Sequence, residues 1–258
     1  MAIKLTSTAE AAKSNGVKAL TYGKAGRGKT VLVATAPNPV LISAESGMLS
    51  LSPENIARIE PVLGRKLPRN IPAIEIQSLN DLVEAFNWCE SSAECKSFET
   101  ICLDSITEIA QRVLAYEKSV TINGKLRDPR QAYGELTDKV SKIMREFRDL
   151  SGKNVYFSAQ QEFVKDDASG ATLYQPSMPG TKLGQQIPYW FDEVFQLEIG
   201  KAPATENSPA YEFRYLRTQP DFSSDAKDRS GALDAMERPD LAYIFAKIRG
   251  ETFTGEPL

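Results

Sequence analysis

One eight-residue stretch constrains this chain more than any other. Residues 23–30 read GKAGRGKT, with glycines at the first, fourth and sixth positions and a lysine and a threonine at the end. A strand-like segment precedes the stretch, and a segment that can be helical follows it. This context suits the pattern G-x-x-x-x-G-K-[ST], in which glycines let backbone N–H groups turn inward around phosphates. The sequence therefore predicts a nucleotide-binding loop, and a plain flexible glycine loop is the alternative.

The pattern also assigns roles within the loop. Lys29 would reach the β- and γ-phosphates, and the Thr30 hydroxyl would hold Mg²⁺. The positive end of the following helix would add to the attraction for phosphate. The residues expected to contact the nucleotide are Gly23, Lys24, Ala25, Gly26, Arg27, Gly28, Lys29 and Thr30.

Composition excludes several other chemistries. None of the 258 residues is a histidine, so Ser-His-Asp and Cys-His catalysis and histidine-bound metals are ruled out. The three cysteines, Cys89, Cys95 and Cys102, lack C-x-x-C spacing and are expected to be reduced thiols. The net charge of -3 restricts any nucleic-acid contact to particular loops.

Apolar runs alternate with segments of helical periodicity along the chain. Because strands that alternate with helices form crossover units, we expect an α/β fold with a largely parallel central sheet and helices on both faces. One core domain, 1–250, would be followed by a loose tail, 251–258. No apolar stretch approaches the roughly 18 residues of a membrane helix, so we expect a cytoplasmic protein without a membrane partner. The expected strands begin near residues 17, 39, 101, 154 and 193, and the expected helices span 79–90, 105–117 and 133–150.

Two carboxylates follow expected strands. The run TICLDS delivers Asp104 to a strand end, where it would order the Mg²⁺ shell, although an aspartate there also suits a helix cap. PVLISAE places Glu45 after the next strand beyond the loop, where it could polarise a water that attacks the γ-phosphate. No N-K-x-D motif for guanine occurs, so ATP is the expected nucleotide.

With the loop, Glu45 and Asp104-Ser105 in this order, the chain resembles the RecA/RadA-type recombinases and their relatives. The resemblance implies a RecA-like P-loop core in which Gln160, at the end of NVYFSAQ, senses the γ-phosphate. AKDRSG would be a K-x-R motif, in which Lys227 and Arg229 reach ATP held by a neighbouring subunit. A homo-oligomer with ATP at its subunit interfaces follows. The short chain is most similar to phage-encoded RecA-like ATPases, including Sak-type single-strand annealing proteins, which act in the host cytoplasm beside a single-stranded DNA-binding protein.

Two segments, 120–134 and 161–188, fall where this family keeps its DNA-binding loops. The first is basic and the second adds aromatic rings that could stack on bases, although solvated surface loops would look similar. At 189–191, core packing is expected rather than base stacking. The expected single-stranded DNA contacts are Lys125, Arg127, Arg130, Phe163, Lys165, Tyr174 and Lys182.

Three functions remain open at this stage. The first is a DNA-stimulated ATPase of phage-type homologous recombination or strand annealing. The second is a P-loop kinase that phosphorylates a small molecule. The third is a nucleotide-dependent scaffold, such as a helicase loader, that scarcely hydrolyses ATP.

Overall fold

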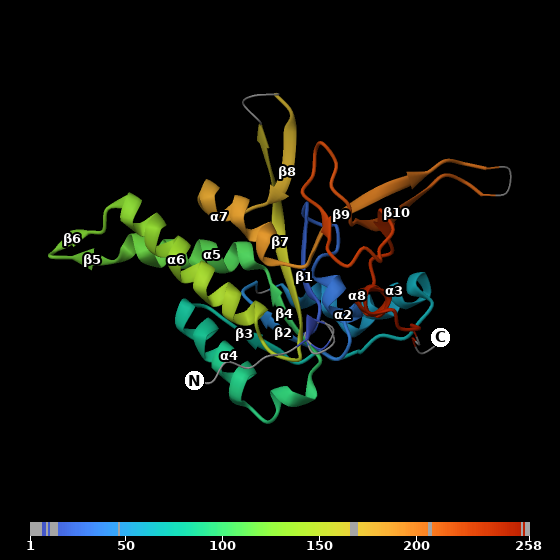
Figure 1. Cartoon of the computed structure of the whole chain (residues 1–258), viewed down its shortest axis with the longest axis horizontal. Helices are drawn as coiled ribbons and strands as arrows, with labels where there is room; N and C mark the ends of the chain where they lie inside the picture. Colours follow the sequence, from blue (N-terminus) through green and yellow to red (C-terminus); the bar gives the residue numbers. More distant parts are fainter. Residues whose placement is uncertain are drawn as a thin grey trace.

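A ten-stranded sheet runs through the molecule (Figure 1). The computed structural model describes residues 7–8, 10, 15–45, 47–165, 170–205, 208–253 and 255. The strand order is β12-β10-β9-β1-β7-β4-β2-β3, with β11 beside β9 and β8 beside β7. All neighbours from β9 to β3 are parallel, which confirms the expected sheet. The strands are β1 (Lys18–Gly23), β2 (Pro39–Ser43), β3 (Ala73–Glu75), β4 (Thr100–Asp104), β5 (Thr121–Ile122), β6 (Lys125–Leu126), β7 (Asn154–Lys165), β8 (Thr172–Pro176), β9 (Glu193–Ala202), β10 (Tyr211–Arg217), β11 (Lys227–Asp228) and β12 (Met236–Glu237).

Several helices begin at polar caps that the sequence supplies. Ser78 and Asp81 form a reciprocal capping box at the start of α4, and the Ser105 side chain accepts from the Glu108 backbone at the start of α5. The expected helices at 79–90, 105–117 and 133–150 are confirmed. The helices are α2 (Val31–Thr35), α3 (Pro53–Leu63), α4 (Leu79–Ser91), α5 (Ile106–Ser119), α6 (Pro129–Arg148), α7 (Thr181–Gln186) and α8 (Leu241–Arg249), with short 3₁₀ turns η1 (Met48–Leu51), η2 (Cys95–Ser97) and η3 (Ile187–Trp190).

Helix α6 begins four residues earlier than its apolar stripe predicts. The Asp128 carboxylate accepts from the backbone N–H of Arg130 at 2.8 Å, and Pro129 occupies the first helical position, where its missing N–H costs nothing. Segment 120–134 is therefore not one open loop. Its first part is the β5–β6 ribbon and its last part is helix.

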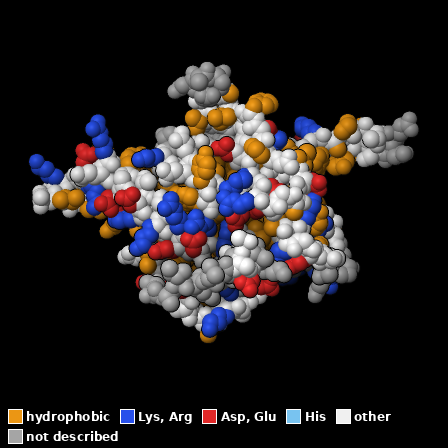
Figure 2. All heavy atoms as spheres, in the orientation of Figure 1, with side chains coloured by type: hydrophobic (Ala, Val, Ile, Leu, Met, Phe, Trp, Pro, Cys, Tyr) orange, Lys and Arg blue, Asp and Glu red, His pale blue; other side chains and the backbone are white. Residues whose placement is uncertain are grey.

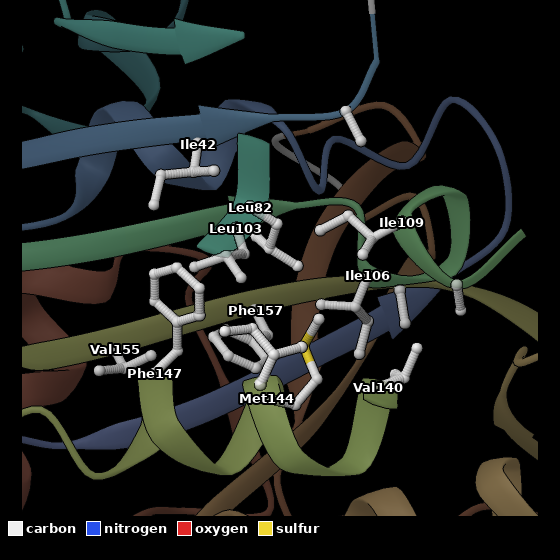
Figure 3. Packing of buried hydrophobic residues seen from close by; sticks show 14 of the residues in the cluster. Ile42, Leu82, Leu103, Ile106, Ile109, Val140, Met144, Phe147, Val155 and Phe157 are labelled. Atoms are coloured by element: carbon white, nitrogen blue, oxygen red, sulfur yellow. The ribbon is translucent and has the colours of Figure 1, made fainter. Parts of the chain in front are cut away.

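Each face of the sheet has its own hydrophobic core. On one face, α6 presents Val140, Met144 and Phe147 to the strands, where Phe157 and Val155 meet them (Figure 3). On the other face, α2 and α8 pack over the strands. Fully burying each such side chain stabilises the fold by about 1.5–3 kcal/mol. The cysteines are free and buried, as expected.

Three two-stranded ribbons leave the body: β5–β6, β7–β8 and β9–β10 (Figure 1). Segment 161–188, expected as a loop, includes the outer half of β7, then β8, α7 and the start of η3, whereas residues 166–169 lie outside the described residues. Its ordered pairing places Phe163 directly opposite Tyr174. The two segments expected as loops, 120–134 and 161–188, thus contain the β5–β6 ribbon and part of the β7–β8 ribbon.

Two further expectations need correction. Trp190 and Phe191 are buried as expected, but Tyr189 is 81 % exposed because the η3 turn directs it outward. Within the expected tail, the Phe253 ring is held by an edge-on contact 5.8 Å from that of Tyr243, whereas residues 254 and 256–258 lie outside the described residues. Within the described residues, no helix has the length and apolar character needed to cross a membrane.

Candidate active site

The glycine-rich loop lies at the carboxyl end of β1, in the middle of the sheet, and leads into α2. Two of its glycines are required by geometry. A Cβ on Gly23 would lie 2.9 Å from the backbone oxygen of Leu197 on β9. Gly28 has a φ of +110°, which side-chain-bearing residues rarely adopt. The strand–loop–helix context of a phosphate-binding loop is therefore confirmed.

Lys29 folds back over the loop. Its Nζ donates to the backbone oxygens of Gly23, at 2.8 Å, and Lys24, at 3.2 Å. Burial lowers the pKa of its amine, and the negative charges of Asp104 and Glu45 oppose that shift. These three side chains thus share one electrostatic environment. The amine can exchange its carbonyl partners for phosphate oxygens.

Asp104 and Glu45 meet because their strands are parallel neighbours. Ser43 pairs with Asp104 across β2 and β4, so the carboxyl ends of both strands lie at the same edge of the sheet. Glu45 Oε1 accepts from the Ser105 hydroxyl at 2.7 Å, and Asp104 accepts from the Ser158 hydroxyl on β7. The Asp104–Ser105 peptide bond is cis. Asp104 is buried, whereas Glu45 is half-buried and open to one side.

Mg²⁺ fits the donors present. Thr30 stands at the N-cap of α2, yet its side chain makes no capping hydrogen bond. A hydroxyl and a carboxylate are the hard oxygen ligands that Mg²⁺ prefers, together with phosphates and waters. Thr30 and Asp104 would hold the ion, and the bound ATP would supply the phosphoryl group and the remaining oxygens.

Gln160 lies at the same edge of the sheet. It pairs with Gly23 across β7 and β1, so it stands level with the start of the loop. Its backbone N–H donates to the Thr107 hydroxyl at 2.9 Å, which ties β7 to α5, and the residue is exposed. This position suits the γ-phosphate sensor that the resemblance implies.

Lys227 and Arg229 lie at the opposite edge of the sheet, near the amino ends of the parallel strands. Strand β11 pairs with the first residues of β9, which in turn pair with the amino end of β1. The Lys227 amine donates to the backbone oxygen of Pro188 at 2.8 Å, and Arg229 forms a 2.8 Å ion pair with Asp192. The structure does not bring this pair together with the loop of its own chain.

The expected DNA-contacting residues differ in their surroundings. Arg127 is 13 % exposed and bonds to the fully buried carboxylate of Glu117, which Lys139 also contacts at 2.7 Å. Arg127 therefore has a partner within the fold, which its position in a basic run did not reveal. The other side chains are exposed, apart from the half-buried Tyr174: Lys125, Arg130, Phe163, Lys165 and Lys182.

Several contacts to the loop escaped the sequence reasoning. Arg214 Nε on β10 donates to the backbone oxygen of Arg27 at 2.9 Å, although the two residues are 187 positions apart. The Tyr156 hydroxyl donates to the backbone oxygen of Lys29 at 3.0 Å. No local pattern marks either side chain, because both act through the assembled sheet.

A separate groove of about 900 Å³ lies between α4 and α6, with Phe86, Cys89 and Ser141 in its lining. None of the loop or carboxylate residues above lines it. Its lining mixes both signs of charge, so its size alone does not make it the reaction site. The phosphate-binding loop and the two carboxylates lie instead at the carboxyl edge of the parallel strands, where ligands of open α/β sheets bind.

Comparisons with known proteins identify the family of the chain. None of the curated proteins compared matches the chain. Among solved structures, the RadB recombinase is similar with a TM-score of 0.43 and 15 % identity, over 87 % of this chain and 91 % of that one. The flagellar accessory protein FlaH from Methanocaldococcus jannaschii is similar with a TM-score of 0.40 and 11 % identity, over 86 % and 84 %. A family model described as AAA domain matches residues 15–230. The chain therefore belongs to the AAA domain family.

Proposed function

We propose that this protein hydrolyses ATP at the carboxyl edge of its parallel strands and uses the reaction on single-stranded DNA, in phage-type recombination or strand annealing. The observation that carries the first half is the shared environment of Lys29, Asp104 and Glu45. Phosphoryl transfer depends almost entirely on positioning and charge stabilisation, and these three groups supply both.

The residues divide the work of hydrolysis. Lys29 would bind the β- and γ-phosphates, and Thr30 and Asp104 would hold Mg²⁺, which would offset the negative charge of the phosphates. Glu45, oriented by the Ser105 hydroxyl, accepts a hydrogen bond from the attacking water. The chain has no histidine, so a carboxylate is the natural base here.

The β5–β6 and β7–β8 ribbons support the proposed action on single-stranded DNA. Lys and Arg side chains gather over β5–β6 and the adjoining end of α6 (Figure 2). Lys125 and Arg130 are exposed there, as phosphate contacts require. On β7–β8, Phe163 is 66 % exposed and lies opposite Tyr174, which suits base stacking.

A homo-oligomer completes the proposed site. Lys227 and Arg229 lie at the edge of the sheet opposite their own loop, so they can act only on ATP bound by another subunit. We place ATP at such subunit interfaces, with the protein working in the host cytoplasm beside a single-stranded DNA-binding protein.

ATP turnover with and without oligo(dT) tests the proposal. We expect release of ADP and phosphate that rises when single-stranded DNA is added. Transfer of the γ-phosphate from radiolabelled ATP to a small molecule, in place of phosphate release, would favour a kinase. Tight ATP binding with no turnover in either condition would favour a scaffold, and both results would contradict the proposal.

A further inference from the structure

The loop between β10 and β11 runs beside the β7–β8 ribbon. The Tyr174 backbone N–H on β8 donates to the backbone oxygen of Ser223 at 2.7 Å, and the Asp225 N–H donates to the Tyr174 oxygen at 3.3 Å. Ser224 forms a parallel bridge with Tyr174. Residues 221–224 form a turn, and residues 223–225 hold this turn against the outer side of β8 (Figure 1).

A network of hydrogen bonds fixes the corner of this loop. The Asp221 carboxylate accepts from the Ser223 N–H at 2.7 Å, from the Ser223 hydroxyl at 2.8 Å and from the Ser224 hydroxyl at 3.0 Å. The same carboxylate pairs with Arg217 at 2.9 Å. Phe222 stands at the corner and is 87 % exposed. An exposed apolar side chain has meaning as a binding surface where it adds to a patch of others.

Two aromatic residues lie on the ribbon next to this corner. Phe163 on β7 pairs with Tyr174 on β8, and Phe222 is two residues before Ser224, which bridges to Tyr174. Hydrophobic side chains gather on the surface below the ribbon tip (Figure 2). The Lys24 amine lies 5.8 Å from the centre of the Tyr174 ring. The aromatic surface thus has a cation at its margin.

We propose that the 219–225 loop is a third contact element for single-stranded DNA, in which Phe222 stacks on a base. The inference rests on the proposed function, because it extends the surface that Phe163 and Tyr174 provide. Stacking suits this position better than a phosphate contact, since Asp221 and Asp225 flank the ring and repel phosphates. The loop therefore adds affinity without adding salt dependence.

Binding of fluorescent oligo(dT) to the ATP-bound protein tests the inference. Removing a stacking platform costs about 1–3 kcal/mol per base, so Phe222→Ala should weaken binding by about 5- to 150-fold. The slope of log affinity against log salt should stay unchanged, and Phe222→Trp should retain binding. Val62→Ala is the matched control, since Val62 is 83 % exposed on α3 and should have no effect.

A second measurement separates direct contact from an indirect effect. An oligonucleotide carrying 5-iodouracil, irradiated in the complex, should crosslink to residues 218–227, in which Phe222 is the one aromatic residue. Normal binding by Phe222→Ala would overturn this inference, and so would crosslinks in the β7–β8 ribbon with none in 218–227. In either case, weaker DNA binding by Phe163→Ala would still support the proposed DNA function. If the wild-type protein binds no oligo(dT) at low salt, the proposed DNA function fails, and this inference fails with it.

Discussion

The edge that carries the phosphate-binding loop and the ribbon β5–β6 are built in opposite ways. At the edge, four parallel strands deliver polar side chains that bond to one another, as Ser158 does to Asp104. On the ribbon and just after it, Lys125 and Arg130 are exposed to solvent, whereas Arg127 is bound to Glu117. Each buried polar group needs a hydrogen-bond partner, so the residues of a buried polar cluster follow a pattern that can be recognised in the sequence. An exposed basic run has no such constraint.

The largest expected effect concerns Arg229, which we propose acts on ATP bound by a neighbouring subunit. An arginine finger contributes about a thousandfold or more to the rate, so Arg229→Ala should silence hydrolysis. Nucleotide binding should persist, because the loop lies at the other edge of the sheet. Turnover and equilibrium binding of a fluorescent ATP analogue check both statements.

Mixing experiments decide whether Arg229 acts between subunits. Arg229→Ala and Lys29→Ala subunits should each be inactive alone. Together they should recover activity at interfaces that combine an intact loop with an intact finger. Absence of recovery in subunits shown to co-assemble would count against this assignment.

The next effect separates the two kinds of basic residue just after the ribbon, one paired with a buried carboxylate and one exposed. Arg127→Ala leaves the buried Glu117 carboxylate with only Lys139, and breaking a buried pair costs about 3–5 kcal/mol. We expect a loss near the lower end of this range, measured by urea unfolding. Arg130→Ala, in an exposed neighbour, should change stability by less than about 0.5 kcal/mol. Equal losses in both variants would remove the distinction.

The smallest effect tests the exposed group itself. Lys125→Ala should leave stability unchanged and reduce the salt slope of single-stranded DNA binding by about 0.7, because one phosphate is no longer neutralised. The loss should be the same on different sequences, since phosphate contacts carry no base information. An unchanged slope would place the DNA elsewhere on the protein.

The sequence predicts the fold and the edge far better than the ribbons. Apolar runs locate β1, β2, β4, β7 and β9, and parallel pairing alone brings Glu45 to Asp104. Local patterns could not reveal that Arg214 holds the loop at Arg27, because the two meet only in the folded sheet. Nor could they show that Arg127 has a buried partner or that an ordered turn exposes Phe222, since the same residues also suit a solvated loop.

One comparison tests the catalytic edge most directly: single-turnover hydrolysis of ATP by Glu45→Gln and by Glu75→Gln. Glu75 pairs with Ser43 across β3 and β2, so it is a carboxylate at the same edge but outside the cluster. We predict that Glu45→Gln binds ATP and retains it unhydrolysed, whereas Glu75→Gln hydrolyses it at the wild-type rate. A wild-type rate for Glu45→Gln would contradict the assignment of Glu45 as the group that positions the attacking water.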